Sequence, residues 1–487
     1  MDAPVVSSAM GVALLTDWIL PFLGALQREL FLFSAVWILI SAIDDLCIDI
    51  IWIVRHFYHR LTFYRYALPR TVKQLFDPHD NKRFAVFVPA WGEAEVIGEM
   101  LHNCTRQWVA FAGRYRIFVG CYANDPQTAA AITQAARTNA DIQIVYVEHD
   151  GPTTKADCLN RLWRALLADE VVERYRAKAV VLHDAEDSVH ADELRVFDCL
   201  VTMRGAVQLP VIPVRTANSR WVSGHYCDEF AEAHSKNMVV REAIGAPLPL
   251  AGVACAIERN LMGRLARLNG GRPFDTNRRP FDTNSLTEDY ELGIRMGAAG
   301  GRTIMARIFD SEGKLVGTRA CFPDTLQTSV RQKTRWLTGI ALAGWDRLGW
   351  EGNIAQKWML FQDRKSIFGT IVVIAAYICL LLTTILGVAQ VQGLYQPTEL
   401  RAEVIMLISL NTAFLIWRLC VRAGFVAALY GPREALLSVP RSIVSNVIAI
   451  IAMRQACTNY LRHCLGAPLT WDKTAHHVMP DKLAHSD

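Results

Sequence analysis

The stretch Ala179-Val180-Val181-Leu182-His183-Asp184-Ala185-Glu186-Asp187 decides the fold of this 487-residue chain. Its four leading apolar residues are typical of a short buried strand, and a cluster of carboxylates follows directly. Carboxylates this close together repel one another unless a cation or hydrogen-bond donors hold them. Hard oxygen ligands of this kind suit Mg²⁺ or Mn²⁺. The stretch therefore predicts a strand that ends either in a metal site formed by Asp184, Glu186 and Asp187 or in a solvated acidic turn.

Short apolar runs upstream of this stretch alternate with segments of helical pattern. The runs lie at 85–88, 116–120 and 142–147, and residues 155–168 read as a helix. This rhythm predicts an α/β domain with a parallel, doubly wound sheet. In such sheets ligands bind beyond the carboxyl ends of the strands, which is where the acidic cluster falls. No Gly-x-Gly-x-x-Gly or Gly-x-x-x-x-Gly-Lys-Ser/Thr motif occurs, so dinucleotide and P-loop sites lose their main support.

The composition indicates a soluble domain carried by membrane helices. With 52% hydrophobic and 20% charged residues, the chain is too apolar for an ordinary soluble enzyme and too charged to lie wholly in a membrane. The net charge of +4 is small for this length and gives no sign of nucleic-acid binding. The 12 cysteines show no metal-binding spacing, which favours reduced thiols and a cytosolic location for the soluble part.

An N-terminal membrane segment is predicted within residues 1–60. Its main span covers about 30–54, which is long enough to cross about 30 Å of hydrocarbon. Basic residues follow from Arg55 onward, so the positive-inside rule places the chain after this point in the cytoplasm. Residues 11–26 form either a further span or a short outer or interfacial helix.

Three carboxylates, Asp44, Asp45 and Asp49, interrupt this span near its cytoplasmic end. Asp45 and Asp49 are four residues apart and therefore share one face of a helix. Carboxylates at this depth must face a bundle interior, a basic partner or water. Two interpretations remain open, namely structural ion pairs at the interface and the lining of a path for a polymer.

A C-terminal membrane region is predicted over residues 367–460. The apolar segments are 367–391, 404–421, 424–431 and 436–453. The first two are long enough to span, whereas the last two form either a further hairpin or helices at the interface. This division leaves residues 76–350 as a cytoplasmic domain between the two membrane regions and residues 461–487 as a cytoplasmic tail.

A second acidic cluster, Thr287-Glu288-Asp289, precedes another helical pattern. Thr287 can cap this helix and place both carboxylates in its first turn, where the helix dipole favours their ionised forms. An ionised Asp289 next to an acceptor hydroxyl can act as a general base, with Glu288 beside it. A purely structural acidic first turn is the alternative.

The segment 324–342 reads as an interfacial helix with Gln332, Arg335 and Trp336 on one face, because residues three and four apart are neighbours on a helix. An indole beside a guanidinium and an amide can stack a sugar or base and bind a diphosphate. A purely structural amphipathic helix at a membrane surface also carries Arg and Trp. Lys155, at a helix start after the third strand, is either a phosphate or uracil contact or an ordinary surface lysine.

Taken in order, these motifs resemble those of the family 2 membrane glycosyltransferases, the relatives of cellulose, chitin and hyaluronan synthases. The matching motifs are Pro89-Ala90-Trp91-Gly92-Glu93, Lys155-Ala156-Asp157-Cys158-Leu159-Asn160, Asp184-Ala185-Glu186-Asp187, Thr287-Glu288-Asp289 and Gln332-x-x-Arg335-Trp336. Within this family the chain looks most like the phage-adsorption protein B type, over about residues 30–475. The ordered set is far more specific than any one motif.

The resemblance implies a GT-A fold, which is a doubly wound, nucleotide-sugar-binding domain, inserted between N- and C-terminal transmembrane helices. It also implies an inverting transfer from a UDP-linked sugar, with Asp289 as the base. Asp184 with Glu186 or Asp187 would bind Mg²⁺ or Mn²⁺, and the stretch 250–255 resembles the acceptor-site strand. Those expected to close over donor and acceptor are Gln332, Arg335 and Trp336. Those expected around the UDP are Pro89, Glu93, Asp125, Lys155, Asn160 and Asp184.

The function expected from this resemblance is synthesis of an exopolysaccharide by a multi-pass protein of the bacterial inner membrane with a cytoplasmic catalytic domain. The donor would be a UDP-sugar, with an N-acetylhexosamine as the suggested sugar, and the acceptor a growing glycan. The other expected partners are membrane lipids and an outer-membrane export component, and no nucleic acid is expected. The alternatives are transfer of one sugar to a lipid carrier and a catalytically inactive receptor or export component. The presence of every expected catalytic side chain argues against an inactive protein.

Overall fold

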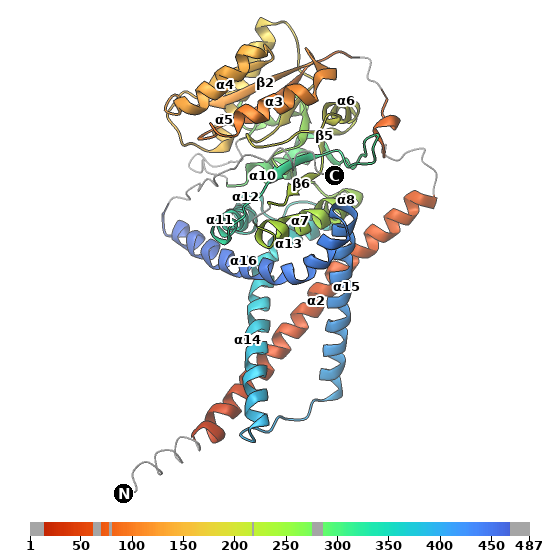
Figure 1. Cartoon of the computed structure of the whole chain (residues 1–487), viewed down its shortest axis with the longest axis vertical. Helices are drawn as coiled ribbons and strands as arrows, with labels where there is room; N and C mark the ends of the chain where they lie inside the picture. Colours follow the sequence, from red (N-terminus) through yellow and green to blue (C-terminus); the bar gives the residue numbers. More distant parts are fainter. Residues whose placement is uncertain (1–13, 62–69, 77–79, 217–218, 275–285, 468–487) are drawn as a thin grey trace.

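The structure, a computed structural model, describes residues 14–61, 70–76, 80–216, 219–274 and 286–467. A soluble α/β domain stands at one end of the molecule, and long apolar helices extend from it toward the other end (Figure 1). A layer of shorter helices lies between these two parts. The described residues include only the first part of the predicted tail, because residues 468–487 lie outside them.

A seven-stranded sheet with the order β3-β2-β1-β4-β7-β5-β8 forms the centre of the soluble domain. The strands are β1 Phe84–Pro89, β2 Tyr115–Cys121, β3 Ile142–Tyr146, β4 Ala179–Leu182, β5 Gly205–Gln208, β7 Cys255–Glu258 and β8 Arg302–Met305. The neighbouring pairs β1–β2, β1–β4 and β2–β3 are parallel, as the alternating pattern predicts. The sheet departs from the wholly parallel expectation at β7, which runs antiparallel to β4 and β5.

The direction of β7 decides which loops meet at the ligand-binding edge of the sheet. Cys255, at the start of β7, pairs with Leu182 at the end of β4. The loop that enters β7 and the acidic turn that leaves β4 therefore lie at the same edge. In a wholly parallel sheet these two loops would stand at opposite edges.

Helices cover both faces of the sheet, which confirms the doubly wound α/β prediction. Side chains alternate along β1, so that Val86 and Val88 join one hydrophobic core and Ala85 and Phe87 join the other. The helices over the first core are α3 Ile97–Gln107, α4 Pro126–Thr138 and α6 Glu193–Arg204. Those over the second are α5 Lys155–Val172 and α9 Arg259–Leu268.

The intermediate layer, called here the membrane-side layer, separates the sheet from the long helices (Figure 1). It consists of α7 Val222–Glu232, η4 Ala233–Asn237, α8 Met238–Ala243, α10 Glu288–Arg295, α11 Leu326–Trp336, η6 Leu337–Leu342, α12 Ala343–Leu348 and α13 Ile354–Arg364. A separate two-stranded parallel sheet, β6 Val211–Val214 with β9 Thr318–Cys321, lies against α7 in this region. The predicted helix 324–342 corresponds to α11 continued by the π-helical η6.

Among the residues that the structure describes, four helices are long and apolar enough to cross a membrane, judged by length and composition. They are the helix Leu15–Tyr58, most of which is α2 Leu20–Leu61, then α14 Ser366–Val391, α15 Ala402–Tyr430 and α16 Pro432–Cys464. The predicted main span lies inside α2. Of the segment 11–26, residues 11–13 lie outside the described residues, and residues 15–26 run directly into α2, so the structure shows neither a separate span nor a separate short helix there.

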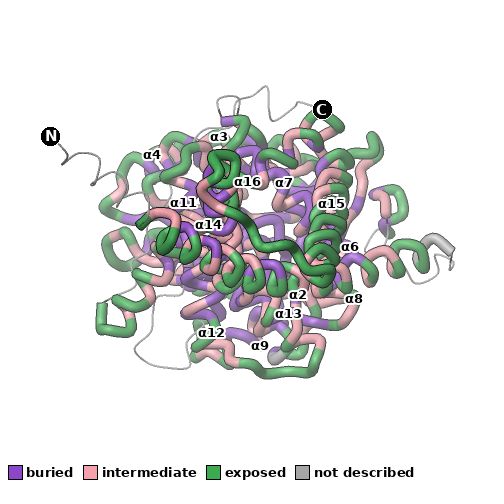
Figure 2. The backbone as a smooth tube through the Cα atoms, turned by 90° about the horizontal axis from the view of Figure 1, so that it is seen from below, coloured by how far each residue is buried: buried purple, intermediate pink, exposed green. Residues whose placement is uncertain are grey.

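The last helix, α16, follows a different course from the other three. It passes beneath the soluble domain, across the upper ends of α14 and α15 (Figure 1). Its buried side chains are Ala435, Ser438, Arg441, Ile448, Ala452 and Ala456. Viewed from below, α15 is mostly exposed, and only Val426 among its residues is buried (Figure 2). Two arrangements are predicted for residues 424–453, namely a further hairpin and helices at the interface. After Gly431 the structure shows one continuous helix, α16, along the surface of the soluble domain.

Candidate active site

A cavity of about 740 Å³ lies between the carboxyl ends of the strands and the membrane-side layer. The predicted site residues that line it are Pro89, Glu93, Lys155, Asp184, Glu186, Asp187, Glu288, Asp289, Gln332, Arg335 and Trp336. Asp125 and Asn160 are not among its lining residues. Segments separated by more than two hundred residues therefore meet at one cavity, as the motifs predict.

The turn after β4 is held in shape by a buried histidine. His183 Nδ1 lies 2.9 Å from Asp187 Oδ2, and its Nε2 lies 2.9 Å from Glu193 Oε1. Burial opposes charge on this ring, but Glu193 and Asp187 outweigh it and raise the pKa of His183 to about 10. Asp187 Oδ2 also accepts a hydrogen bond of 3.0 Å from the Asp184 backbone N–H. The imidazolium thus fixes the backbone that carries Asp184.

The three predicted metal ligands consequently differ in their surroundings. Asp187 is buried and bonded to His183, whereas Asp184 and Glu186 are partly exposed in the cavity lining. Among the described residues, no three His, Cys, Asp or Glu side chains form a group suited to a metal ion. The two carboxylates of Asp184 and Glu186 still provide hard oxygen donors, which suit Mg²⁺ or Mn²⁺ when a phosphate and water complete the coordination.

Lys155 stands at the centre of the acidic groups in the cavity. It is the first residue of α5, whose start is capped by Thr154. Its Nζ lies 2.5 Å from Asp184 Oδ1 and donates a 3.4 Å hydrogen bond to the carbonyl oxygen of Gly252. Although burial disfavours the ammonium, Asp184 and the two carboxylates of the Thr287-Glu288-Asp289 motif raise the pKa of Lys155. The lysine therefore remains a cation shared among several acids.

Glu288 and Asp289 occupy the first turn of α10, as predicted. Thr287 is the N-cap residue, but its side chain makes no capping hydrogen bond, so the predicted capping by its hydroxyl is wrong. Burial and the adjacent Asp289 raise the pKa of Glu288 to about 7. Burial also raises the pKa of Asp289, while Lys155 opposes this shift. Near neutral pH, the two neighbouring acids disfavour each other's ionisation.

A glycine permits the close packing around Asp289. Gly252 has φ +76°, and a Cβ atom there would lie 2.5 Å from Asp289 Oδ2. It belongs to the loop before β7, the stretch whose sequence resembles an acceptor-site strand. This loop therefore contacts both the candidate base and, through the carbonyl of Gly252, Lys155.

The motif on α11 presents a mixed polar and aromatic surface to the cavity. Gln332, Arg335 and Trp336 all line it. The Trp336 ring packs edge-on against Tyr226 at a centroid distance of 6.2 Å, and it lies 6.3 Å from Phe230.

The opposite face of α11 packs on α16, where the Thr334 hydroxyl donates a 3.2 Å hydrogen bond to Gln455 Oε1. The helix thus lies between the cavity and α16. One face carries the predicted binding residues, and the other packs as expected for an amphipathic helix.

An aromatic pair that lines the cavity was not predicted from the sequence. The rings of Trp91 and Tyr122 meet edge to face at 5.1 Å, and the Tyr122 hydroxyl lies 2.5 Å from Thr153 Oγ1. Trp91 also packs on Gly151, where a Cβ atom would lie 2.5 Å from the indole. The position of Trp91 inside the Pro89–Glu93 motif was the available signal.

Asp125 and Asn160 support the backbone around the cavity. Asp125 Oδ2 accepts a 2.6 Å hydrogen bond from the N–H of Gly92, and its Oδ1 accepts one from Thr128 at the start of α4. Asn160 is buried, and its Oδ1 accepts a 3.1 Å hydrogen bond from the N–H of Phe274. Both residues shape the loops next to the lining instead of forming part of it.

Comparison with known proteins places this site in a family. A family model described as "Glycosyltransferase like family 2" matches residues 81–339, which is more than half of the chain. The chain belongs to this family. The match includes every residue predicted above for donor, metal or base, so the prediction of a family 2 glycosyltransferase domain is confirmed.

This glycosyltransferase-like chain is also similar to curated proteins over most of its length. It is 32% identical over 467 residues to "Bacteriophage adsorption protein B" of Escherichia coli (strain K12). The identity to "Bacteriophage N4 adsorption protein B" of Escherichia coli O157:H7 is the same. The match covers 91% of this chain but 61% of each relative, so the chain spans about three fifths of their length. The predicted similarity to the phage-adsorption protein B type is confirmed.

A solved structure supports the fold. The mannosyltransferase PcManGT from Pyrobaculum calidifontis, in complex with GDP-Man and Mn²⁺, matches with a TM-score of 0.51 and 17% identity. The match covers 89% of this chain and 99% of that chain. At this identity the comparison shows a shared fold. The prediction of a GT-A-like domain, flanked at both ends by helices apolar enough to span a membrane, is confirmed.

Proposed function

We propose that this protein is an inverting glycosyltransferase that moves a sugar from a UDP-sugar to a growing glycan at the bacterial inner membrane. The observation that carries the proposal is the convergence of Asp184, Lys155 and Asp289 in one cavity, with Arg335 and Trp336 opposite them. A sugar nucleotide presents a diphosphate, a base and an anomeric carbon, and the cavity offers cations, aromatic rings and a candidate base for these groups.

In the proposed reaction, Asp289 accepts the proton of an acceptor hydroxyl. The acceptor oxygen attacks the anomeric carbon as the bond from this carbon to the diphosphate oxygen breaks, and UDP leaves. A single displacement inverts the anomeric centre and needs one base carboxylate, unlike the carboxylate pair of glycosidases. Glu288 retains a proton more readily than an exposed glutamate because its pKa is raised, which limits the negative charge beside Asp289.

The leaving diphosphate is stabilised by positive charge around the cavity. Lys155 and Arg335 supply fixed cations that line it. Asp184 and Glu186 would hold Mg²⁺ or Mn²⁺, which when bound supplies further positive charge for the developing phosphate oxyanion. The presence of Mn²⁺ with GDP-Man in the mannosyltransferase of the same fold supports this assignment. Trp91 and Tyr122 provide aromatic surface for the nucleoside.

The proposed orientation places the catalytic domain in the cytoplasm. α2, α14 and α15 are the proposed spans, and α16 lies along the interface, because it buries one side against the soluble domain. The basic residues after α2, beginning at Arg55, support this orientation. The proposed domain limits are those expected from the sequence, with the glycosyltransferase domain at 76–350. Membrane lipids and an outer-membrane export component complete the proposed partners.

A second candidate is transfer of one sugar to a lipid carrier. The membrane-side wall of the cavity includes Phe230, Met238 and Ile340, which offer apolar surface to a hydrocarbon chain. The glycan remains the first choice because the motif from Gln332 to Trp336 is typical of polymer synthases in the family that the chain resembles. The non-enzymatic alternative receives no support from the cavity, since every side chain expected to act as base or metal ligand lines it.

The test uses the full chain purified in detergent with Mn²⁺ and a panel of UDP-sugars. GDP-sugars serve as a control for the identity of the nucleobase. Released UDP and the partition of radiolabelled sugar between aqueous and organic phases are measured. Release of UDP with label in an aqueous polymer is the expected result. A monosaccharide in the organic phase establishes the second candidate. No release from any donor overturns both proposals.

A further inference from the structure

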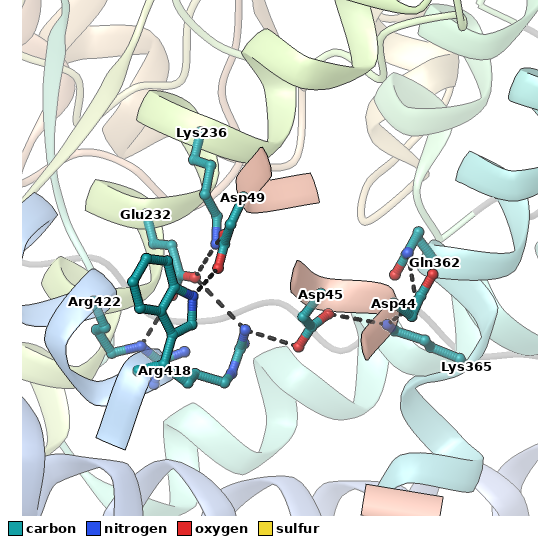
Figure 3. Close-up of polar contacts among 10 residues, drawn as sticks. Asp44, Asp45, Asp49, Glu232, Lys236, Gln362, Lys365, Arg418 and Arg422 are labelled. Atoms are coloured by element: carbon teal, nitrogen blue, oxygen red, sulfur yellow. Dashed lines mark hydrogen bonds and ion pairs between the residues drawn. The ribbon is translucent and has the colours of Figure 1, made fainter. Parts of the chain in front are cut away.

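Eight charged side chains form a connected set around residues 44–49 of α2 (Figure 3). We call the set the α2 charge network, and its members are Asp44, Asp45, Asp49, Glu232, Lys236, Lys365, Arg418 and Arg422. Four carboxylates face four cations, so the formal charge of the set is zero. Its members come from α2, α7, η4, the residue before α14, and α15.

One half of the network joins α2 to η4. Lys236 Nζ lies 2.5 Å from Asp49 Oδ1 and 2.8 Å from Glu232 Oε1, and all three residues are buried. Arg422 Nε lies 3.0 Å from Glu232 Oε2. The indole N–H of Trp417 donates a 2.8 Å hydrogen bond to the second carboxylate oxygen of Asp49.

The other half joins α2 to the junction of α13 and α14. Arg418 Nη1 lies 2.8 Å from Asp45 Oδ2 and 3.8 Å from Glu232 Oε1, which links the two halves. Lys365 Nζ lies 3.1 Å from Asp45 and 2.6 Å from Asp44. The structure therefore shows the first of the two arrangements left open for these aspartates, namely ion pairs.

The network lies directly behind one wall of the catalytic cavity. The residues of α7, η4 and α8 that line the cavity are Glu229, Phe230, Ala233, His234 and Met238. The opposite side of the same helical stretch faces α2. There, Trp52 Nε1 donates a 3.0 Å hydrogen bond to the Ser235 carbonyl, and Arg55 Nη1 donates a 3.2 Å hydrogen bond to the Val239 carbonyl. A π-helical turn such as η4 is common at functional sites.

We propose that Asp49 and Lys236 are positioning residues that hold this wall, residues 229–238, at a fixed distance from the catalytic carboxylates. Separation of the pair would leave the buried Asp49 carboxylate without the cation that it contacts, although Lys236 would keep Glu232, so the cost of stranding Asp49 fixes the wall to α2. A displacement of about 1 Å in a catalytic site can lower turnover about a hundredfold. The effect on turnover rests on the proposed function, whereas the attachment of the wall rests on the contacts alone.

The experiment compares Lys236→Met with the charge-balanced double variant Asp49→Asn/Lys236→Met in the full chain. Hydrogen–deuterium exchange of residues 222–243, the Kd for UDP and the rate of UDP release are measured. For Lys236→Met we expect exchange about tenfold faster in this segment and turnover about tenfold lower, with the Kd for UDP within about twofold. The double variant recovers part of both losses, because it strands no charge.

A buried ion pair away from the cavity provides the matched control. Arg259 lies 2.7 Å from Glu170, and both side chains are less than a tenth exposed. Arg259→Met should reduce thermal stability while leaving exchange in 222–243 and turnover unchanged.

Wild-type exchange in 222–243 for Lys236→Met overturns the proposal, as does an equal change in this segment for Arg259→Met. If Lys236→Met does not fold, the double variant decides, because exchange equal to the wild type contradicts attachment through this pair. A wild type that releases no UDP leaves the exchange arm intact, so failure of the proposed function remains distinguishable.

Discussion

Glu232 and Glu288 are both deeply buried, with 3% and 7% of their surface exposed, yet their acidities move in opposite directions. Burial raises the pKa of each carboxyl. At Glu232, the cations Arg418, Arg422 and Lys236 outweigh burial and bring the pKa down to about 2. At Glu288, the adjacent Asp289 adds to burial, and the pKa rises to about 7. The number of neighbouring cations therefore decides the outcome.

This contrast distinguishes the α2 charge network from the acidic groups that line the cavity. In the α2 charge network every carboxylate has a cation in the protein, so the network is complete without a ligand. In the cavity, Lys155 is shared by Asp184, Glu288 and Asp289. A site with more acid than base can accept a metal ion or a proton during a reaction.

The largest effect is expected for Asp289→Asn, which keeps the shape of the side chain but removes the base. Turnover should fall about a thousandfold, the order expected for loss of a general base. The Kd for UDP should stay within about threefold, because the proposed nucleoside contacts, Trp91 and Tyr122, are unchanged in this variant. UDP release and isothermal calorimetry measure the two quantities. Turnover near that of the wild type would remove Asp289 from the mechanism.

A stability effect of intermediate size is expected for Glu232→Gln. The substitution leaves Lys236, Arg418 and Arg422 with one carboxylate fewer, and the loss of one partner from a buried pair costs about 3–5 kcal/mol. Thermal unfolding in detergent measures the change. Glu170→Gln, in the buried pair with Arg259, is the control for a site with one cation. An unchanged midpoint for Glu232→Gln contradicts the network as a stabilising element.

The same residue predicts a pH dependence. Because the folded pKa of Glu232 lies below its ordinary value of 4.5, its contribution to stability is complete above pH 4.5 and is lost as the pH falls toward about 2. The wild type should therefore lose more stability than Glu232→Gln over this interval. Parallel pH curves for the two proteins would show that the cations do not act on this carboxyl.

The smallest effect is expected for Glu288→Gln. The raised pKa of Glu288 means that it gains a negative charge beside the diphosphate site as the pH rises through about 7. Above this pH the KM for the donor should increase about two- to fivefold in the wild type, by repulsion between like charges. The variant should show a flat KM between pH 6 and 8. The same rise in both proteins would exclude Glu288 as its source.

In contrast to that of Glu232, the ionisation of Glu288 should lower the stability of the fold as the pH rises. Its folded pKa lies above the ordinary 4.5, so the folded state binds the proton more tightly. Below pH 4.5 this carboxyl is protonated in both the folded and the unfolded state and does not oppose folding. The free energy of unfolding then falls as the pH rises from 4.5 through about 7. The Gln variant should remove that decline, which thermal unfolding at pH 5 and pH 8 measures.

Local sequence patterns predicted the parts of the fold that depend on neighbouring residues. The strands at β1 to β4 and the acidic turn after Leu182 followed from short apolar runs and their boundaries. The direction of β7 did not, because the four residues from Cys255 to Glu258 carry no signal about which neighbouring strand they pair with. The predicted capping by Thr287 was wrong because a residue type suited to a cap can face other groups.

Contacts between distant residues limited the prediction of the site in the same way. Asp49 was expected to need a partner, but Lys236 is 187 positions away and lies in an ordinary-looking helix. The spacing groups Asp187 with Asp184, whereas in three dimensions Asp187 pairs with His183, whose other ring nitrogen lies against Glu193. Residue types identified the chemistry of the cavity, and packing decided which carboxylates face it.

The length of α2 gives the bilayer a route to the cavity. Its 42 residues rise about 63 Å, roughly twice the thickness of the hydrocarbon. Long helices answer a thinner membrane by tilting further. Since the proposed attachment through Lys236 joins α2 to the wall at residues 229–238, a change in the tilt of α2 would act on that wall of the cavity.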